Sequence, residues 1–208
     1  MTFRIGIVVF DRVEELDFIG PWEVLNMAAR LGADADVHLV AQLAGQVRCN
    51  YGLSVQVEWD FDRCPPLDLI LIPGGQGTRT EVDNPVLIDF VRRQASRASW
   101  SVSVCTGAFI LERAGVLQGR RATTHWASLD RLRALGAVDV VEERFVVDGN
   151  VASSAGISAG IDMALWLVDH LWGREIALKT QKMMEYYPKP PFSDEDVAAI
   201  EPPSYVLR

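Results

Sequence analysis

Two short runs of nearly continuous apolar residues constrain the fold of this chain more than any other feature. They are residues 3–10 (FRIGIVVF) and residues 67–73 (LDLILIP). Runs of this length, rich in Ile, Val and Leu, are typical of strands that are buried on both faces of a parallel sheet. We therefore interpret both runs as central strands.

Helical patterns alternate with strand-like segments along the rest of the chain. Pro21 suits the first position of one helix, and Asp148-Gly149 is typical of a hairpin turn. Further strands are predicted at 37–41, 99–104 and 121–125, and helices at 22–31, 85–95, 107–114, 126–135 and 158–172. This alternation predicts an α/β sandwich with a mainly parallel sheet covered on both faces.

Length and composition narrow the class of protein. A chain of 208 residues without an internal repeat or linker in its first 187 residues predicts one domain, 1–192, followed by a proline-rich irregular tail, 193–208. Lys and Arg number 20 against 28 Asp and Glu, which argues against a nucleic-acid partner. No segment has the pattern of a membrane span or signal peptide, so we expect no membrane partner. Three cysteines without Cys-x-x-Cys spacing predict a reducing, cytoplasmic location.

Ligands of such folds bind beyond the carboxyl ends of the strands. The segments 14–20, 74–78 and 105–107 are predicted to meet there. The topology alone therefore points to these three loops as the functional edge of the sheet.

Cys105 is the sharpest candidate for chemistry. It lies in Ser103-Val104-Cys105-Thr106-Gly107, between a strand and a helix, which is the pattern of a nucleophile elbow. The start of the following helix would favour its thiolate form. The pentapeptide fits a buried structural cysteine equally well. Cys49 and Cys64 lie at no strand-to-helix turn, and we expect both to be passive.

Asp17 is the second candidate, since it stands between Leu16 and Phe18 at the end of the first predicted loop. Burial or a neighbouring thiolate would raise its pKa, and such an acid could hold a proton for sulfur or position a water. A helix cap or an exposed loop acid is the alternative. We expect Glu14 and Glu15 to be solvated.

The glycine turn at 74–78 lacks the Lys of a phosphate-binding loop, and its N–H groups are instead suited to an oxyanion hole opposite Cys105. His125 ends a strand on the same edge and is a candidate to approach Cys105. His38 and His170 are expected to be structural. No cluster has the spacing of a metal site, and we expect no metal.

Together these motifs, with Ala122-Thr123-Thr124-His125-Trp126, resemble the ThiJ/PfpI superfamily over residues 3–192. Three further segments, 16–21, 156–162 and 186–192, are most similar to its isonitrile hydratase branch. The resemblance implies a flavodoxin-like three-layer sandwich, a homodimer and catalysis without a cofactor. A small-molecule isonitrile would be the substrate.

The resemblance also implies site roles. Cys105 matches the nucleophile, Asp17 its acidic partner, and Thr106 the residue that offers a backbone N–H. Gly75 matches the glycine whose N–H faces sulfur, and Gly20 and His125 complete the expected substrate-binding set. Proteolytic members place a His directly after the cysteine; Thr106 stands there, so protease activity is not expected.

The expected reaction is attack of Cys105 on the isonitrile carbon to give a thioimidate. Asp17 would then activate a water, and an N-substituted formamide would be released. Three alternatives stay open: a glyoxalase-like enzyme acting on α-oxoaldehydes, a redox sensor based on Cys105, and a small-molecule sensing domain. For the last, we expect no DNA-binding module in this acidic chain of 208 residues.

Overall fold

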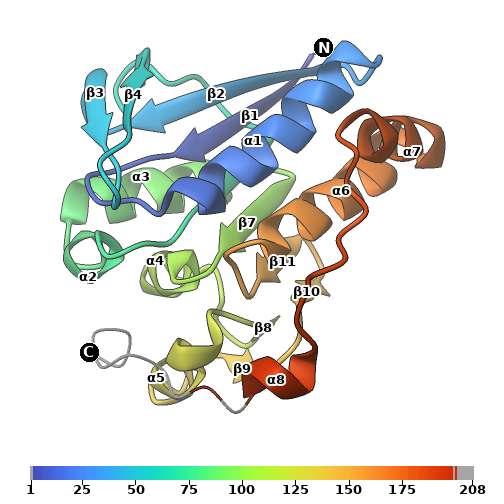
Figure 1. Ribbon diagram of the computed structural model, residues 1–208. Helices are drawn as coiled ribbons and strands as arrows, with labels where there is room; N and C mark the ends of the chain where they lie inside the picture. Colours follow the sequence, from blue (N-terminus) through green and yellow to red (C-terminus); the bar gives the residue numbers. More distant parts are fainter. Residues whose placement is uncertain (1, 199, 201–208) are drawn as a thin grey trace.

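A seven-stranded sheet forms the centre of the protein, which is described here by a computed structural model covering residues 2–198 and 200 (Figure 1). The strand order is β10-β11-β7-β6-β1-β2-β5, and neighbouring strands are parallel except for the β10–β11 pair. The strands are β1 (Phe3–Val8), β2 (Ala35–Ala41), β5 (Trp59–Asp60), β6 (Leu69–Ile72), β7 (Trp100–Val104), β10 (Phe145–Asp148) and β11 (Val151–Ser154). Every residue of β6 and β7 is buried, which confirms that the second apolar run is a central strand.

Helices cover both faces of this sheet. On one face α1 (Glu15–Arg30), α6 (Ala159–Trp172) and α7 (Arg174–Met183) pack against one another. On the other lie α2 (Thr78–Glu81), α3 (Pro85–Ala95) and α4 (Gly107–Arg113), as Figure 1 shows. The predicted three-layer α/β sandwich is thus confirmed.

The first helix begins earlier than the sequence predicts. We expected a loop up to Gly20 and a helix start at Pro21, but α1 begins at Glu15 and contains Pro21 in its interior. An interior proline costs roughly 3 kcal/mol because it cannot donate the helical hydrogen bond. Burial of Phe18, Val24 and Leu25 offsets that cost at roughly 1.5–3 kcal/mol per side chain. Asp17 consequently lies in a helix and not in a loop.

Smaller elements sit at the edges of the sandwich. A hairpin of β3 (Gly45–Arg48) and β4 (Ser54–Val57), which we did not predict, stands beside the main sheet. The segment predicted as a helix from residue 126 begins as a 3-10 turn, η1 (Trp126–Ser128), and continues as α5 (Leu129–Arg133). Two short strands, β8 (Arg121–Ala122) and β9 (Asp139–Val140), pair in parallel next to it.

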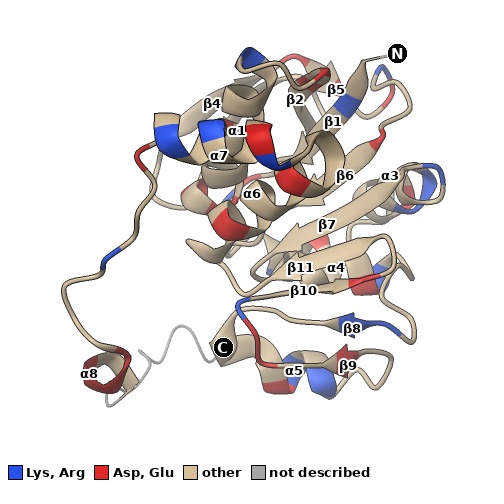
Figure 2. Ribbon diagram, turned by 90° about the vertical axis from the view of Figure 1, so that its right-hand side faces the viewer, with Lys and Arg blue, Asp and Glu red and all other residues tan. Residues whose placement is uncertain are grey.

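The chain after α7 leaves the sandwich. Residues 187–198 are all exposed, and Figure 2 shows them running away from the sheet to a short helix, α8 (Asp194–Ala198). This helix lies inside the tail that we expected to be irregular, while residues 199 and 201–208 of that tail lie outside the described residues. No helix in the described part of the chain is long and apolar enough to cross a membrane.

Candidate active site

Cys105 occupies a strained turn between β7 and α4. Its φ angle is +55°, a left-handed conformation that is uncommon for any residue other than glycine. Two backbone contacts hold the turn: the Cys105 N–H donates to the Ser154 carbonyl over 2.9 Å, and the Thr124 hydroxyl donates to the Cys105 carbonyl over 2.8 Å. The elbow geometry is therefore present, and it directs the thiol at the carboxyl edge of the sheet.

Two glycines make room for this turn. A Cβ on Gly107 would lie 2.0 Å from the carbonyl oxygen of Ile72, so α4 can approach the strands only because the side chain is absent. A Cβ on Gly156 would lie 2.5 Å from Cβ of Cys105. Gly156 also has a φ of +72°, which favours glycine. Both positions are thus fixed by close approach to the elbow.

Asp17 lies behind the thiol, sealed from solvent with 0% of its surface exposed. Its Oδ2 accepts a hydrogen bond from the Gly74 N–H over 2.9 Å. Among the described residues no group donates a hydrogen bond to its buried Oδ1, although the carboxyl interacts with the Cys105 thiol. Desolvation, together with the nearby charge of Glu14, raises the pKa of Asp17 to about 8, against the lowering effect of the Gly74 N–H.

The thiol of Cys105 does not have the lowered pKa that its place before a helix suggested. Burial is the largest cause that raises its pKa, and the charge of Asp17 adds to it, while the N–H and hydroxyl of Thr106 act in the opposite direction. α4 is only 7 residues long, so its dipole is weak compared with desolvation. Asp17 raises the pKa of Cys105, whereas the hydrogen bond from the thiol lowers the pKa of Asp17. Burial keeps both pKa values above their ordinary ones, and the two groups titrate as a coupled pair.

The hydroxyl of Thr106 joins the glycine turn to the elbow. The Gly75 N–H donates to Oγ1 of Thr106 over 3.1 Å, and the Thr78 hydroxyl donates to the Gly75 carbonyl over 2.7 Å. We expected the Gly75 N–H to face sulfur, but in this structure it is engaged by Thr106. Gly75 therefore orients the Thr106 hydroxyl, and Thr106 supplies the hydrogen bonds that reach Cys105.

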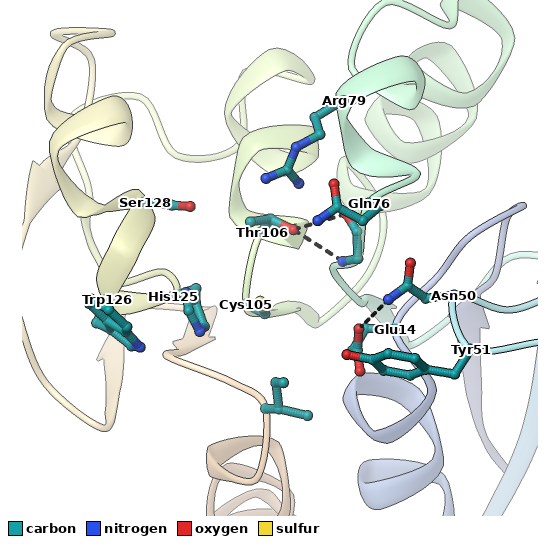
Figure 3. A pocket seen from close by; sticks show the side chains of 12 residues that line it. Glu14, Asn50, Tyr51, Gln76, Arg79, Cys105, Thr106, His125, Trp126 and Ser128 are labelled. Carbon is teal, nitrogen blue, oxygen red and sulfur yellow. Dashed lines mark hydrogen bonds between the residues drawn. The ribbon is translucent and has the colours of Figure 1, made fainter. Parts of the chain in front are cut away.

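A cavity of about 280 Å³ opens above the elbow. That volume lies near the lower end of the range for small-molecule sites. Figure 3 shows Cys105 between two walls, one carrying His125 and Trp126 and the other Glu14, Asn50 and Tyr51. The lining residues are Glu14, Asn50, Tyr51, Gly75, Gln76, Arg79, Cys105, Thr106, His125, Trp126, Ser128 and Ile157.

Of the two expected substrate-binding residues His125 and Gly20, one lines the cavity and the other lies between two helices. His125 lines the cavity, and burial followed by the charge of Arg79 lowers its pKa, so the imidazole is neutral and offers one donor and one acceptor. Gly20 does not fulfil the expectation. It lies where α1 packs on α6, and a Cβ there would come within 2.9 Å of Cγ1 of Ile161.

The sequence did not lead us to expect that Glu14, Asn50 and Tyr51 form one wall of the cavity. Glu14, expected to be solvated, is half-buried at the N-cap position of α1, where its side chain makes no capping hydrogen bond and instead accepts from Nδ2 of Asn50 over 3.1 Å. Asn50 and Tyr51 lie at the tip of the β3–β4 hairpin, and Asn50 is 36 residues from Glu14 along the chain. The alternating valines of this hairpin on either side of an Asn-Tyr-Gly turn were the signal that could have revealed it.

Comparison with known proteins adds a sequence match along most of the chain. Residues 3–170 match the DJ-1/PfpI family. The chain is 43% identical over 192 residues to the isonitrile hydratase of Pseudomonas putida, which covers 92% of this chain and 82% of that protein. It is 29% identical over 185 residues to the HTH-type transcriptional regulator GbdR of Pseudomonas aeruginosa, covering 88% of this chain but 50% of the regulator.

Solved structures agree with these matches. A ThiJ/PfpI family protein from Pseudomonas syringae has a TM-score of 0.88 at 31% identity, with 100% of this chain and 84% of that chain covered. Drosophila melanogaster DJ-1beta has a TM-score of 0.79 at 20% identity, with 89% and 98% covered, and this second likeness shows the fold alone.

Proposed function

The chain belongs to the DJ-1/PfpI family, and on that premise we propose that it is an isonitrile hydratase. The observation that carries the proposal is the strained Cys105 thiol, paired with buried Asp17, on the wall of a cavity of small-molecule size. The 43% identity to an isonitrile hydratase over 92% of the chain supports it. The reaction adds water to an isocyanide and gives an N-substituted formamide.

In the first step sulfur attacks the isonitrile carbon. The attacking species is the thiolate, which the N–H and hydroxyl of Thr106 favour against the opposing effects of burial and Asp17. The C–S bond then forms, the thiol proton reaches the carbon, and a thioimidate results. Asp17 acts as the relay for this proton.

In the second step water adds to the thioimidate carbon. The carbon–sulfur bond then breaks, sulfur regains a proton, and the formamide leaves. Thr106 N–H stabilises the negative charge that returns to sulfur. Gly75 takes part only by holding the Thr106 hydroxyl in place.

Turnover of para-nitrophenyl isocyanide by purified, reduced protein tests the proposal. Cys105→Ala should abolish formamide formation. Cys64→Ala is the matched control, since Cys64 is a half-buried free thiol in another cavity, and it should retain full activity. Absence of turnover by folded wild type would overturn the proposal, and α-oxoaldehydes would become the next substrates to assay.

The assembly and location are part of the same proposal. All three cysteines are free, which supports a reducing compartment such as the cytoplasm. The resemblance implies a homodimer, and light scattering in solution tests it: a mass near twice the 23.1 kDa of one chain is expected.

A further inference from the structure

The burial of Asp17 raises a question about the second step of the proposed reaction. We expected this acid to activate the water, yet it is 0% exposed and lies behind sulfur, with Oδ2 occupied by the Gly74 N–H. A water that attacks the thioimidate has to approach from the cavity, since that is where the substrate carbon is held. A base for this water must therefore lie on the cavity wall.

Glu14 meets that requirement by position. Its backbone N–H donates to the Gly74 carbonyl over 3.0 Å, and the position of a Cβ on Gly75 would lie only 2.3 Å from its nitrogen. The same glycine turn thus contacts Glu14, Asp17 and Thr106. The Glu14 side chain lines the cavity, and Figure 3 shows it across from His125 with Cys105 between them.

The position and the pKa of the Glu14 carboxylate also suit a general base. Asn50 Nδ2 donates to its Oε2 over 3.1 Å, which fixes the carboxylate against the β3–β4 hairpin. Burial, followed by the charge of Glu15, raises the pKa of Glu14 above its ordinary value, with the hydrogen bond from Asn50 partly opposing this. A base whose pKa lies nearer the working pH transfers protons more effectively.

We propose that Glu14 is a catalytic residue that holds the hydrolytic water and takes its proton during breakdown of the thioimidate. The inference rests on the proposed isonitrile hydratase function. The water oxygen bonds to the thioimidate carbon while one water proton passes to Glu14 and on to the imidate nitrogen. The C–S bond then breaks, its electron pair returns to sulfur, and the second water proton restores the thiol.

The two acids would therefore divide the reaction between them. Asp17 serves sulfur in the formation of the thioimidate, and Glu14 serves water in its hydrolysis. His125 also lines the cavity, and burial followed by the charge of Arg79 lowers the pKa of its imidazole, so a His125→Gln variant is compared with Glu14→Gln. The cavity also holds the cation Arg79 and the phenol Tyr51, neither of which is a base at neutral pH.

The test is rapid mixing of Glu14→Gln with para-nitrophenyl isocyanide, followed by intact-protein mass spectrometry and a steady-state assay. Gln keeps an acceptor for Asn50, so the wall is preserved. We expect formation of the Cys105 adduct at a rate close to that of wild type. We also expect adduct accumulation and a fall in kcat of at least ~100-fold, the usual scale of general base catalysis. Glu14→Asp should recover part of kcat.

Matched variants separate this role from electrostatics. Glu15→Gln removes the acidic charge next to Glu14, at a side chain whose carboxylate accepts a hydrogen bond from the Tyr51 N–H. This variant should not accumulate the adduct. Normal turnover in Glu14→Gln, or accumulation in His125→Gln alone, overturns the role of Glu14 and leaves the proposed function standing. A wild type that forms no adduct and no formamide overturns both.

Discussion

Replacing Asp17 with Asn is expected to stabilise the fold while it removes activity. The structure buries this carboxyl completely, and its pKa rises from 3.8 to about 8. In the unfolded chain the same group ionises near its ordinary value. Between these two values the native state holds a proton that the unfolded chain has released, so stability falls as pH rises from about 4 to about 8.

The size of the effect follows from the two pKa values. At pH 7 the native carboxyl is still protonated, although this pH lies about 3 units above the pKa of the unfolded chain. Each unit corresponds to about 1.4 kcal/mol, so the burial of Asp17 lowers the free energy of unfolding by at most about 4 kcal/mol. At pH 5 the same difference is about 2 kcal/mol. Asn does not ionise, and its side-chain oxygen can still accept from the Gly74 N–H.

Urea unfolding of wild type and Asp17→Asn at pH 5 and pH 7 measures this difference. We expect the variant to be more stable at pH 7, with an advantage that shrinks at pH 5, and to have lost most of its turnover. Asp139→Asn, at an exposed position on β9, is the control for loss of one acidic charge. An advantage that is equal at both pH values, or a variant less stable at pH 7, would refute the reasoning.

Three further changes test the geometry around the elbow. Thr106→Val leaves the buried Gly75 N–H without its acceptor, and urea unfolding should show a loss of about 1–3 kcal/mol together with reduced turnover. Gly156→Ala places a methyl group 2.5 Å from Cβ of Cys105, so kcat should fall sharply in a variant whose circular dichroism stays native. Asn84→Ala removes the cap of α3 and should cost about 1 kcal/mol of stability with turnover unchanged, which separates fold from site.

The local sequence pattern was sufficient to predict the core of the fold. The run at 67–73 predicted a strand buried on both faces, and β6 is buried throughout. The Asn84-Pro85 start predicted α3, where Asn84 accepts from the N–H groups of Val86 and Leu87. The small residues around Cys105 predicted the elbow, and its positive φ angle matches. These features depend on residues within a few positions of one another, so they are visible in sequence.

Long-range packing decided the beginning of α1. Taken alone, Pro21 is best placed at the start of a helix, and the sequence gives no sign that it is tolerated further inside. Only contact between α1 and α6, where Gly20 meets Ile161, shows why the helix extends back to Glu15. That extension carries Asp17 from a loop into a helix and buries it.

The sequence by itself determined the sandwich, the segments that form its central buried strands and the position of the cysteine turn. Only the tertiary structure decided which groups surround that cysteine. Glu14 and Asn50 meet although 36 residues separate them, and the Gly75 N–H turns to Thr106, 31 residues away. Hydrophobic periodicity reports which face of an element is buried, but contacts between distant side chains depend on how the finished layers pack.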